Sequence, residues 1–98
     1  GTKAIDELRA RAKATTRGET GSYSLDDICD EWAREFYFEG IRRPTLIRFG
    51  RYGGNNNYNW SWKGNAETGK NFDSHLNIFP IPVGELNANS NLQQNPGY

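Results

Sequence analysis

The spacing of apolar positions predicts helices in the first half of this 98-residue chain. Over residues 3–14, apolar residues recur at helical spacing with basic residues between them. The strongest helical pattern covers residues 25–39, where Ser24 is a favourable N-cap and Gly40 follows as a C-terminal stop. The apolar stripe of this second helix consists of Leu25, Ile28, Cys29, Trp32 and Phe36, with Tyr37 as its last candidate member.

The pattern predicts a third, shorter helix and then dissolves. Residues 44–49 begin with a proline, which is tolerated at the first helical position. The polar, glycine-punctuated stretch 15–23 is expected to be a loop, and the glycine- and asparagine-rich stretch 50–75 a long irregular segment. Residues 79–82 alternate with prolines and predict an extended strip, and the asparagine-rich remainder to residue 98 predicts coil. The fold class is therefore mainly α, with long irregular loops and an extended tail.

Composition adds that this is a folded chain whose core depends on aromatic rings. Leu, Ile, Val and Phe together number only eighteen, but the net charge is zero and thirteen aromatic residues supply concentrated apolar area. The balanced charge disfavours general binding to nucleic acid or to anionic membranes. A single cysteine, Cys29, excludes an internal disulfide framework, and its place on the helical stripe predicts a buried apolar residue.

Three glutamates are the first candidate for chemistry. Glu31, Glu35 and Glu39 are spaced by four and would stack on one helix face, where like charges repel one another. One interpretation is a structural ion-pair network, because arginine binds carboxylates through two parallel hydrogen bonds. The alternative is a pair of catalytic carboxylates, as in glycoside hydrolases. The arginines available to the network are Arg34, Arg42, Arg43 and Arg48.

Aromatic residues interleaved with asparagine are the second candidate. Tyr58, Trp60 and Trp62 lie within a stretch whose asparagines offer donors and acceptors for sugar hydroxyls, while rings pack on the C–H face of a sugar. The alternative is that these rings fold back over the second helix and complete the core. Both interpretations stay open on the residues alone.

Other chemistry finds little support in the sequence. The arginine- and glycine-rich stretch 42–54 superficially resembles a nucleic-acid-binding segment, but the surrounding acidic residues cancel the field that such binding needs. His75 has no cysteine or histidine partner at metal-ligand spacing, so neither a metal nor a cofactor is expected.

Five elements in order resemble the SusD/RagB family. Residues 5–12 are similar to its "INxLRxRAG" helix, and residues 25–50 to its "LDxILDERaREfyfEGhRrxDLiRfGr" block. Residues 58–64 are similar to "YNWPWKGG", residues 79–82 complete the order, and the ending resembles "ELNANPNLxQNPGY". The departures from these motifs are Trp32, Ile41, Pro44, Thr45 and Ser61.

The resemblance implies the function of a glycan-capture lipoprotein. Members of this family of Bacteroidetes are expected to have a mainly helical, tetratricopeptide-type fold and to sit at the outer-membrane surface. They are expected to bind oligosaccharides without acting as enzymes and to deliver them to a SusC-like TonB-dependent transporter. Residues 1–98 would then be the C-terminal part of such a domain, architectural in role. The N-terminal lipid anchor and most glycan-binding residues would lie on chain that precedes it.

Overall fold

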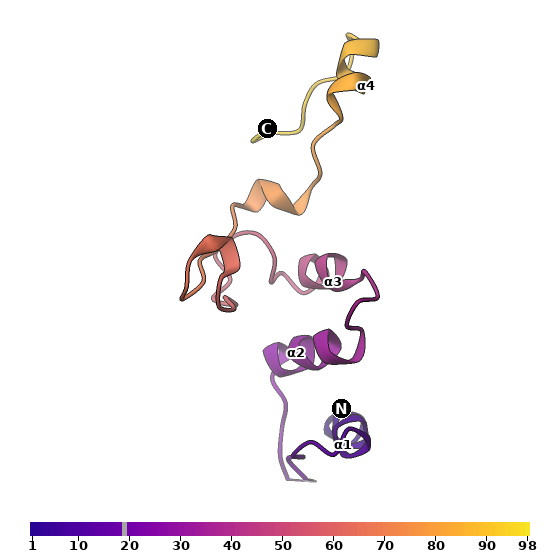
Figure 1. Cartoon of the computed structure of the whole chain (residues 1–98), viewed down its shortest axis with the longest axis vertical. Helices are drawn as coiled ribbons and strands as arrows, with labels where there is room; N and C mark the ends of the chain where they lie inside the picture. The colour runs from indigo at the N-terminus through magenta and orange to yellow at the C-terminus, as the bar shows by residue number, and fades with distance from the viewer. Residues whose placement is uncertain (19) are drawn as a thin grey trace. The chain divides into compact units, whose positions relative to one another are not determined.

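The computed structural model describes residues 1–18 and 20–98, which form two compact units, residues 1–49 and 50–98. Helices make up the regular structure, and the described residues contain no β-strand (Figure 1). The predicted mainly α fold class is confirmed, whereas the tetratricopeptide-type arrangement stays a prediction. No helix within the described part of the chain has the length and hydrophobicity needed to cross a bilayer.

The described residues of the first unit form three helices, α1 (Thr2–Arg11), α2 (Leu25–Glu35) and α3 (Arg42–Arg48). All three were predicted, with shifted ends. Because α3 begins two residues before Pro44, the proline is the third helical residue and not the first. It is still tolerated, since the amide groups of the first helical turn have no partner within the helix. The loop predicted over residues 15–23 is confirmed apart from Glu19, which lies outside the described residues.

Helix α2 starts at the predicted N-cap. The Ser24 hydroxyl accepts a hydrogen bond from the Asp27 amide at 3.1 Å, and the Asp27 carboxylate accepts one from the Ser24 amide at 2.8 Å. This reciprocal arrangement is a capping box, which satisfies two amide groups at the helix start. On the apolar side of α2, Cys29 is fully buried, as predicted, and Leu46 of the neighbouring helix α3 is 2% exposed.

The predicted C-terminal end of α2 is wrong. The helix stops at Glu35, and a turn through Phe38 and Gly40, both with positive φ (65° and 75°), leads into α3. Consecutive aromatic residues after Glu35 are weak helix formers, and a continued helix would have stacked Glu39 on the like charges below it. The early end also takes Tyr37 off the apolar stripe, where the sequence had placed it, and leaves it exposed.

The second unit is held together by turns and side chains more than by regular elements. It contains two 3₁₀ turns, η1 (Lys63–Asn65) and η2 (Ser74–Asn77), followed by a short helix, α4 (Val83–Ala88) (Figure 1). An isolated parallel bridge pairs Gly53 with Phe72 within the otherwise irregular segment. The long irregular segment was predicted, but α4 was not, and the expectation of coil there is wrong. Six residues are too few to show a helical period, and two of them, Gly84 and Asn87, disfavour helix.

The asparagine-rich tail is ordered by hydrogen bonds from its side chains to the extended strip before α4. The Gln94 side chain accepts from the Ile81 amide at 2.8 Å and donates to the Ile81 carbonyl at 3.0 Å. Asn95 donates to the Phe79 carbonyl at 2.8 Å, and the Tyr98 hydroxyl donates to the Ile78 carbonyl at 2.6 Å. We call these three tail residues the tail clamp.

Candidate functional site

The segment of residues 52–72, here called the aromatic loop, gathers most of the rings of the second unit. Phe72 lies at its centre, with ring centroids 5.1 Å from Tyr52 and 6.1 Å from Trp60. Tyr58 packs edge-on against Trp60 at 6.3 Å. Perpendicular and tilted pairs at these separations are favourable contacts between aromatic rings. Two of the three rings proposed from the sequence, Tyr58 and Trp60, are therefore in direct contact.

Trp62 differs from its neighbours in exposure and in backbone conformation. Its side chain is 65% exposed, against 39% for Trp60, and its φ is +69°. A positive φ is uncommon for a bulky residue and persists only where the surrounding structure holds the backbone. Hydrogen bonds on both sides hold it here: the Trp62 amide donates to the Glu67 carbonyl, and the Trp62 carbonyl accepts from Asn65. The loop thus presents one large ring to solvent from a fixed backbone.

A glycine allows this loop to close. Gly69 has a φ of +75°, and a Cβ atom at this position would collide with the backbone carbonyl of Trp60. The chain after η1 can therefore approach Trp60 only where a side chain is absent.

Lys63, which no sequence pattern singled out, packs against the Trp60 and Phe72 rings. Lys63 is 1% exposed, and its Nζ donates to the Tyr58 carbonyl at 3.1 Å. Nζ also lies 4.9 Å from the ring centroid of Trp60 and 5.2 Å from that of Phe72, within the range of cation–π attraction. Burial lowers the pKa of this ammonium group. No local pattern indicated this burial, because lysine is rarely buried and only the folded loop brings its compensating partners together.

The glutamates of α2 are paired with arginines, two of which come from α1. Glu31 accepts from Arg34 at 2.6 Å and from Arg9 at 2.9 Å. Both carboxylate oxygens of Glu35 accept from Arg11 Nη2 at 2.6 Å.

The other members of the proposed network are placed differently. Glu39 lies beyond the end of α2, so the three glutamates do not share one helix face. Arg42 donates to the Cys29 carbonyl at 2.7 Å, a contact that links α3 to α2. Arg43 and Arg48 belong to α3, the latter as its last residue. Arg9 and Arg11 were not predicted as partners of these glutamates, because their pairing depends on how α1 lies against α2.

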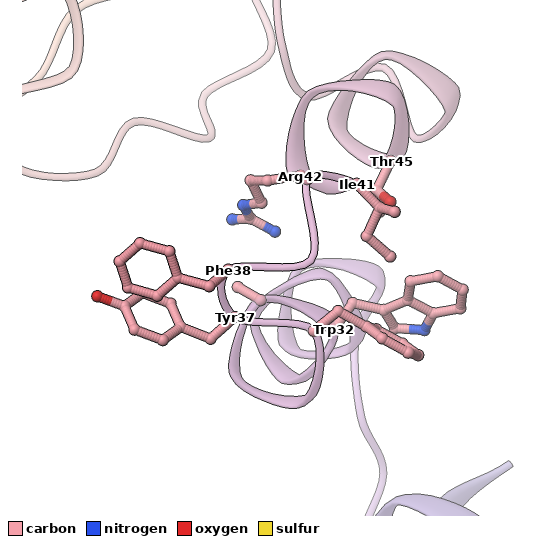
Figure 2. Close-up of a pocket in the computed structure, with 9 residues that line it drawn as sticks. Trp32, Tyr37, Phe38, Ile41, Arg42 and Thr45 are labelled. Atoms are coloured by element: carbon pink, nitrogen blue, oxygen red, sulfur yellow. The ribbon is translucent and has the colours of Figure 1, made fainter.

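An apolar groove of about 390 Å³ lies beside the turn between α2 and α3. Figure 2 shows Tyr37 and Phe38 pointing to one side of this turn, away from Trp32. Their rings pack edge-to-face at 4.5 Å, and Phe38 is 91% exposed. The sequence did not predict this groove, because a helix that continued to residue 39 would leave no turn at this place.

His75 has a structural position in the second unit. Its Nδ1 lies 2.9 Å from the Asp73 carboxylate, and its ring packs edge-on against Tyr98 at 4.8 Å. Hydrogen bonds from the His75 side chain and amide lower the pKa of Asp73. The described residues contain no group of three or more side chains able to hold a metal ion.

Comparison with known proteins places the chain in a family. The model of the SusD family matches residues 2–98, so the chain belongs to that family. Among curated proteins, it is similar to the starch-binding protein SusD of Bacteroides thetaiotaomicron, with 48% identity over 94 residues. The match covers 96% of this chain and 16% of that relative. The chain therefore spans about a sixth of the length of the curated relative that it matches.

Proposed function

We propose that the protein carrying this chain binds oligosaccharides of the starch type and does not alter them chemically. The observation that supports this proposal best is the 48% identity to a starch-binding protein over nearly the whole chain. The chemistry of binding within this chain would come from the aromatic loop.

Within the chain, we propose that Trp62 makes the principal contact with a sugar ring. It is the most exposed of the three candidate rings, and its backbone is fixed by hydrogen bonds before any ligand arrives. An exposed indole on a fixed backbone can meet a ligand without rearrangement of the main chain, which favours affinity. Tyr58 and Trp60 contact each other and would serve mainly as its support.

Glycan affinity of the intact protein tests this assignment. Replacing Trp62 by alanine should weaken the binding of starch oligosaccharides about tenfold, the loss expected when one aromatic contact is removed. Titration calorimetry on the intact protein measures the change. Tyr37→Ala is the matched control, because Tyr37 is also an exposed aromatic residue but lies in the first unit. Unchanged affinity of the Trp62 variant would remove the aromatic loop from the binding site.

The alternative of a glycoside hydrolase is less well supported by the geometry. The carboxylates of Glu31 and Glu35 are both engaged by guanidinium groups, and Glu39 is not on their helix. A hydrolase needs one carboxylic acid that is free to protonate the leaving oxygen. Incubation of the intact protein with starch oligosaccharides should therefore release no new reducing ends. Turnover that disappears in a Glu35→Gln variant would contradict a purely binding role.

We further propose that the intact protein is a lipoprotein on the surface of the outer membrane and hands its ligand to a SusC-like TonB-dependent transporter. Membership of the SusD family supports this location and partner. Isolation from bacterial membranes, followed by intact-mass and N-terminal analysis, should find a diacylated cysteine at the start of the mature protein. Recovery as an unlipidated protein in the soluble fraction would count against this location. Co-purification with a TonB-dependent barrel would support the transporter as partner.

A further inference from the structure

The turn between α2 and α3 exposes a continuous apolar surface. Phe38 is 91% exposed and stands at the groove of about 390 Å³, whose lining also includes Trp32, Phe36 and Ile41. Figure 2 shows the Tyr37 and Phe38 rings projecting together from the turn. Aromatic side chains carry about 150–250 Å² of surface each. The patch therefore reaches a few hundred Å², the size at which apolar surfaces of soluble proteins mark interaction sites.

Phe38 is an unfavourable residue for the position that it occupies. Its φ of +65° lies in the left-handed region, which asparagine and glycine adopt far more readily than bulky residues. Asn57 and Asn65 have the same backbone conformation and are polar, as contact with water favours. The turn is closed by a hydrogen bond from the Glu39 amide to the Phe36 carbonyl at 3.1 Å, which does not involve the Phe38 side chain. Because asparagine would suit both the backbone and the solvent, the exposed ring indicates a contact that the turn itself does not supply.

The length of the relative indicates what makes this contact. The match to SusD leaves about five-sixths of that protein outside the aligned region, so the intact molecule would contain much more polypeptide than this chain. The first unit needs additional packing, because Cys29 and Leu46 are the only fully buried apolar side chains among its described residues. A segment of the same molecule is favoured over a second copy or a separate protein, since covalent linkage holds it at a high effective concentration.

We propose that the groove beside Phe38 is the docking surface for an apolar segment of the same polypeptide, from the part that the family resemblance places before residue 1. In the intact protein, the Phe38 ring is buried against aliphatic or aromatic side chains of that segment, and this burial offsets the unfavourable backbone conformation. Tyr37 packs edge-on against Phe38 at 4.5 Å, and its hydroxyl suits the polar rim of such an interface. The inference goes beyond glycan binding and does not depend on it.

Asparagine at position 38 gives opposite results for an open and a covered groove. In a groove open to water, Phe38→Asn suits the solvent and the positive φ, so the melting temperature of the intact protein would stay unchanged or rise. In a covered groove, the substitution removes the contacts of the ring and buries an amide, so we expect the melting temperature to fall by at least about 2 °C. Lys13→Asn is the matched control, because Lys13 is exposed and has a φ of +56°. An unchanged or raised melting temperature for Phe38→Asn would overturn the proposal.

Photo-cross-linking identifies what covers the groove. The variant Phe38→p-benzoylphenylalanine of the intact protein is compared with a control that carries the same substitution at Glu7, an exposed residue of α1. Both are irradiated in bacterial membranes, before purification can remove a partner, and the cross-linked peptides are identified by mass spectrometry. We expect position 38 to cross-link within the same molecule to one upstream peptide rich in apolar residues, and position 7 to give no dominant product.

Every other product would contradict the assigned occupant. A product of twice the mass would place a second copy on the groove, and a product that contains another protein would make the groove a surface for a separate partner. A cross-link within residues 1–98, a cross-link to a small molecule, or no cross-link in a folded variant would leave the upstream polypeptide without a role at this surface. Glycan affinity enters neither measurement, so these outcomes overturn the inference and leave the proposed function standing.

Discussion

At the scale of single residues, the sequence was most informative where an interaction is local. Ser24 was predicted as the N-cap of α2 from its residue type and its position before the apolar stripe, and the structure adds a reciprocal bond with Asp27, three residues away. The burial of Cys29 followed from the same helical periodicity. Lys63 could not be predicted, because two of its three ammonium contacts involve rings that only the folded loop brings together.

The capping box makes the stability of α2 depend on pH. Hydrogen bonds from the Ser24 amide and then from its hydroxyl lower the pKa of Asp27, helped by the guanidinium of Arg17. A carboxyl group whose pKa is lower in the folded state stabilises that state fully above its unfolded pKa of about 3.9. This contribution is lost as the pH falls through the lower, folded pKa.

We expect the free energy of unfolding to show this loss in a comparison with Asp27→Asn. Asparagine can still accept a hydrogen bond from the Ser24 amide but carries no charge at any pH. The stability advantage of the wild type should be largest near neutral pH and should shrink as the pH is lowered below about 4. Urea denaturation of both proteins at several pH values measures it. A difference that stays constant down to pH 3 would contradict the role assigned to the Asp27 carboxylate.

At the scale of elements, helices were predicted well in existence and less well at their ends. The first two helices follow from apolar periodicity and α3 was predicted from Pro44 as a helix start, but the end of α2 depends on a turn through Phe38 with positive φ, which no local signal indicated. Gly40 was correctly seen as a stop signal, but the helix had already ended at Glu35. The coil predicted for the tail is confirmed beyond α4, but its ordering was not predicted, because its side chains bond to a backbone segment thirteen or more residues away.

The hydrogen bonds of the tail clamp give a structural role to several residues of the ending that resembles the family motif. Gln94 uses its amide group as a peptide group would, accepting from the Ile81 N–H and donating to the Ile81 carbonyl. Gly97 has a φ of +96°, and a Cβ atom there would lie 2.6 Å from the His75 side chain, so the terminal turn requires glycine. The described residues contain no β-strand that could pair with the extended strip, and side chains of the tail satisfy its Phe79 and Ile81 carbonyl groups instead.

We expect Gln94→Glu to open the clamp. The substitution keeps the size of the side chain but replaces the donor to the Ile81 carbonyl by an oxygen that repels it. Leaving that carbonyl without its donor should cost about 1–3 kcal/mol, felt mainly as local opening of residues 78–98. Hydrogen exchange at the Ile81 amide measures the effect, with Gln93→Glu as the control at the exposed neighbouring residue. Equal protection in the two variants would show that the bond donated by Gln94 contributes nothing to order.

At the scale of the whole chain, the predicted dependence on aromatic residues has a consequence for stability. Among the described residues, only Cys29 and Leu46 are fully buried apolar side chains, and both lie in the first unit. The second unit is organised by ring contacts, glycine turns and hydrogen bonds from side chains to the main chain. Such interactions order a chain locally but bury little apolar area, and buried apolar area is the main source of cooperative stability.

The 98-residue chain studied by itself should therefore unfold over a broad temperature range, with a midpoint below about 60 °C and a weak dependence on denaturant. Circular dichroism at the helical and aromatic wavelengths should give transitions that do not coincide, because helices and aromatic loop lose structure separately. Leu46→Ala should remove most of the helical signal, since it empties one of the two buried apolar positions, whereas Val83→Ala, at an exposed position, should change little. A single sharp transition well above about 60 °C would contradict the burial pattern from which this expectation is derived.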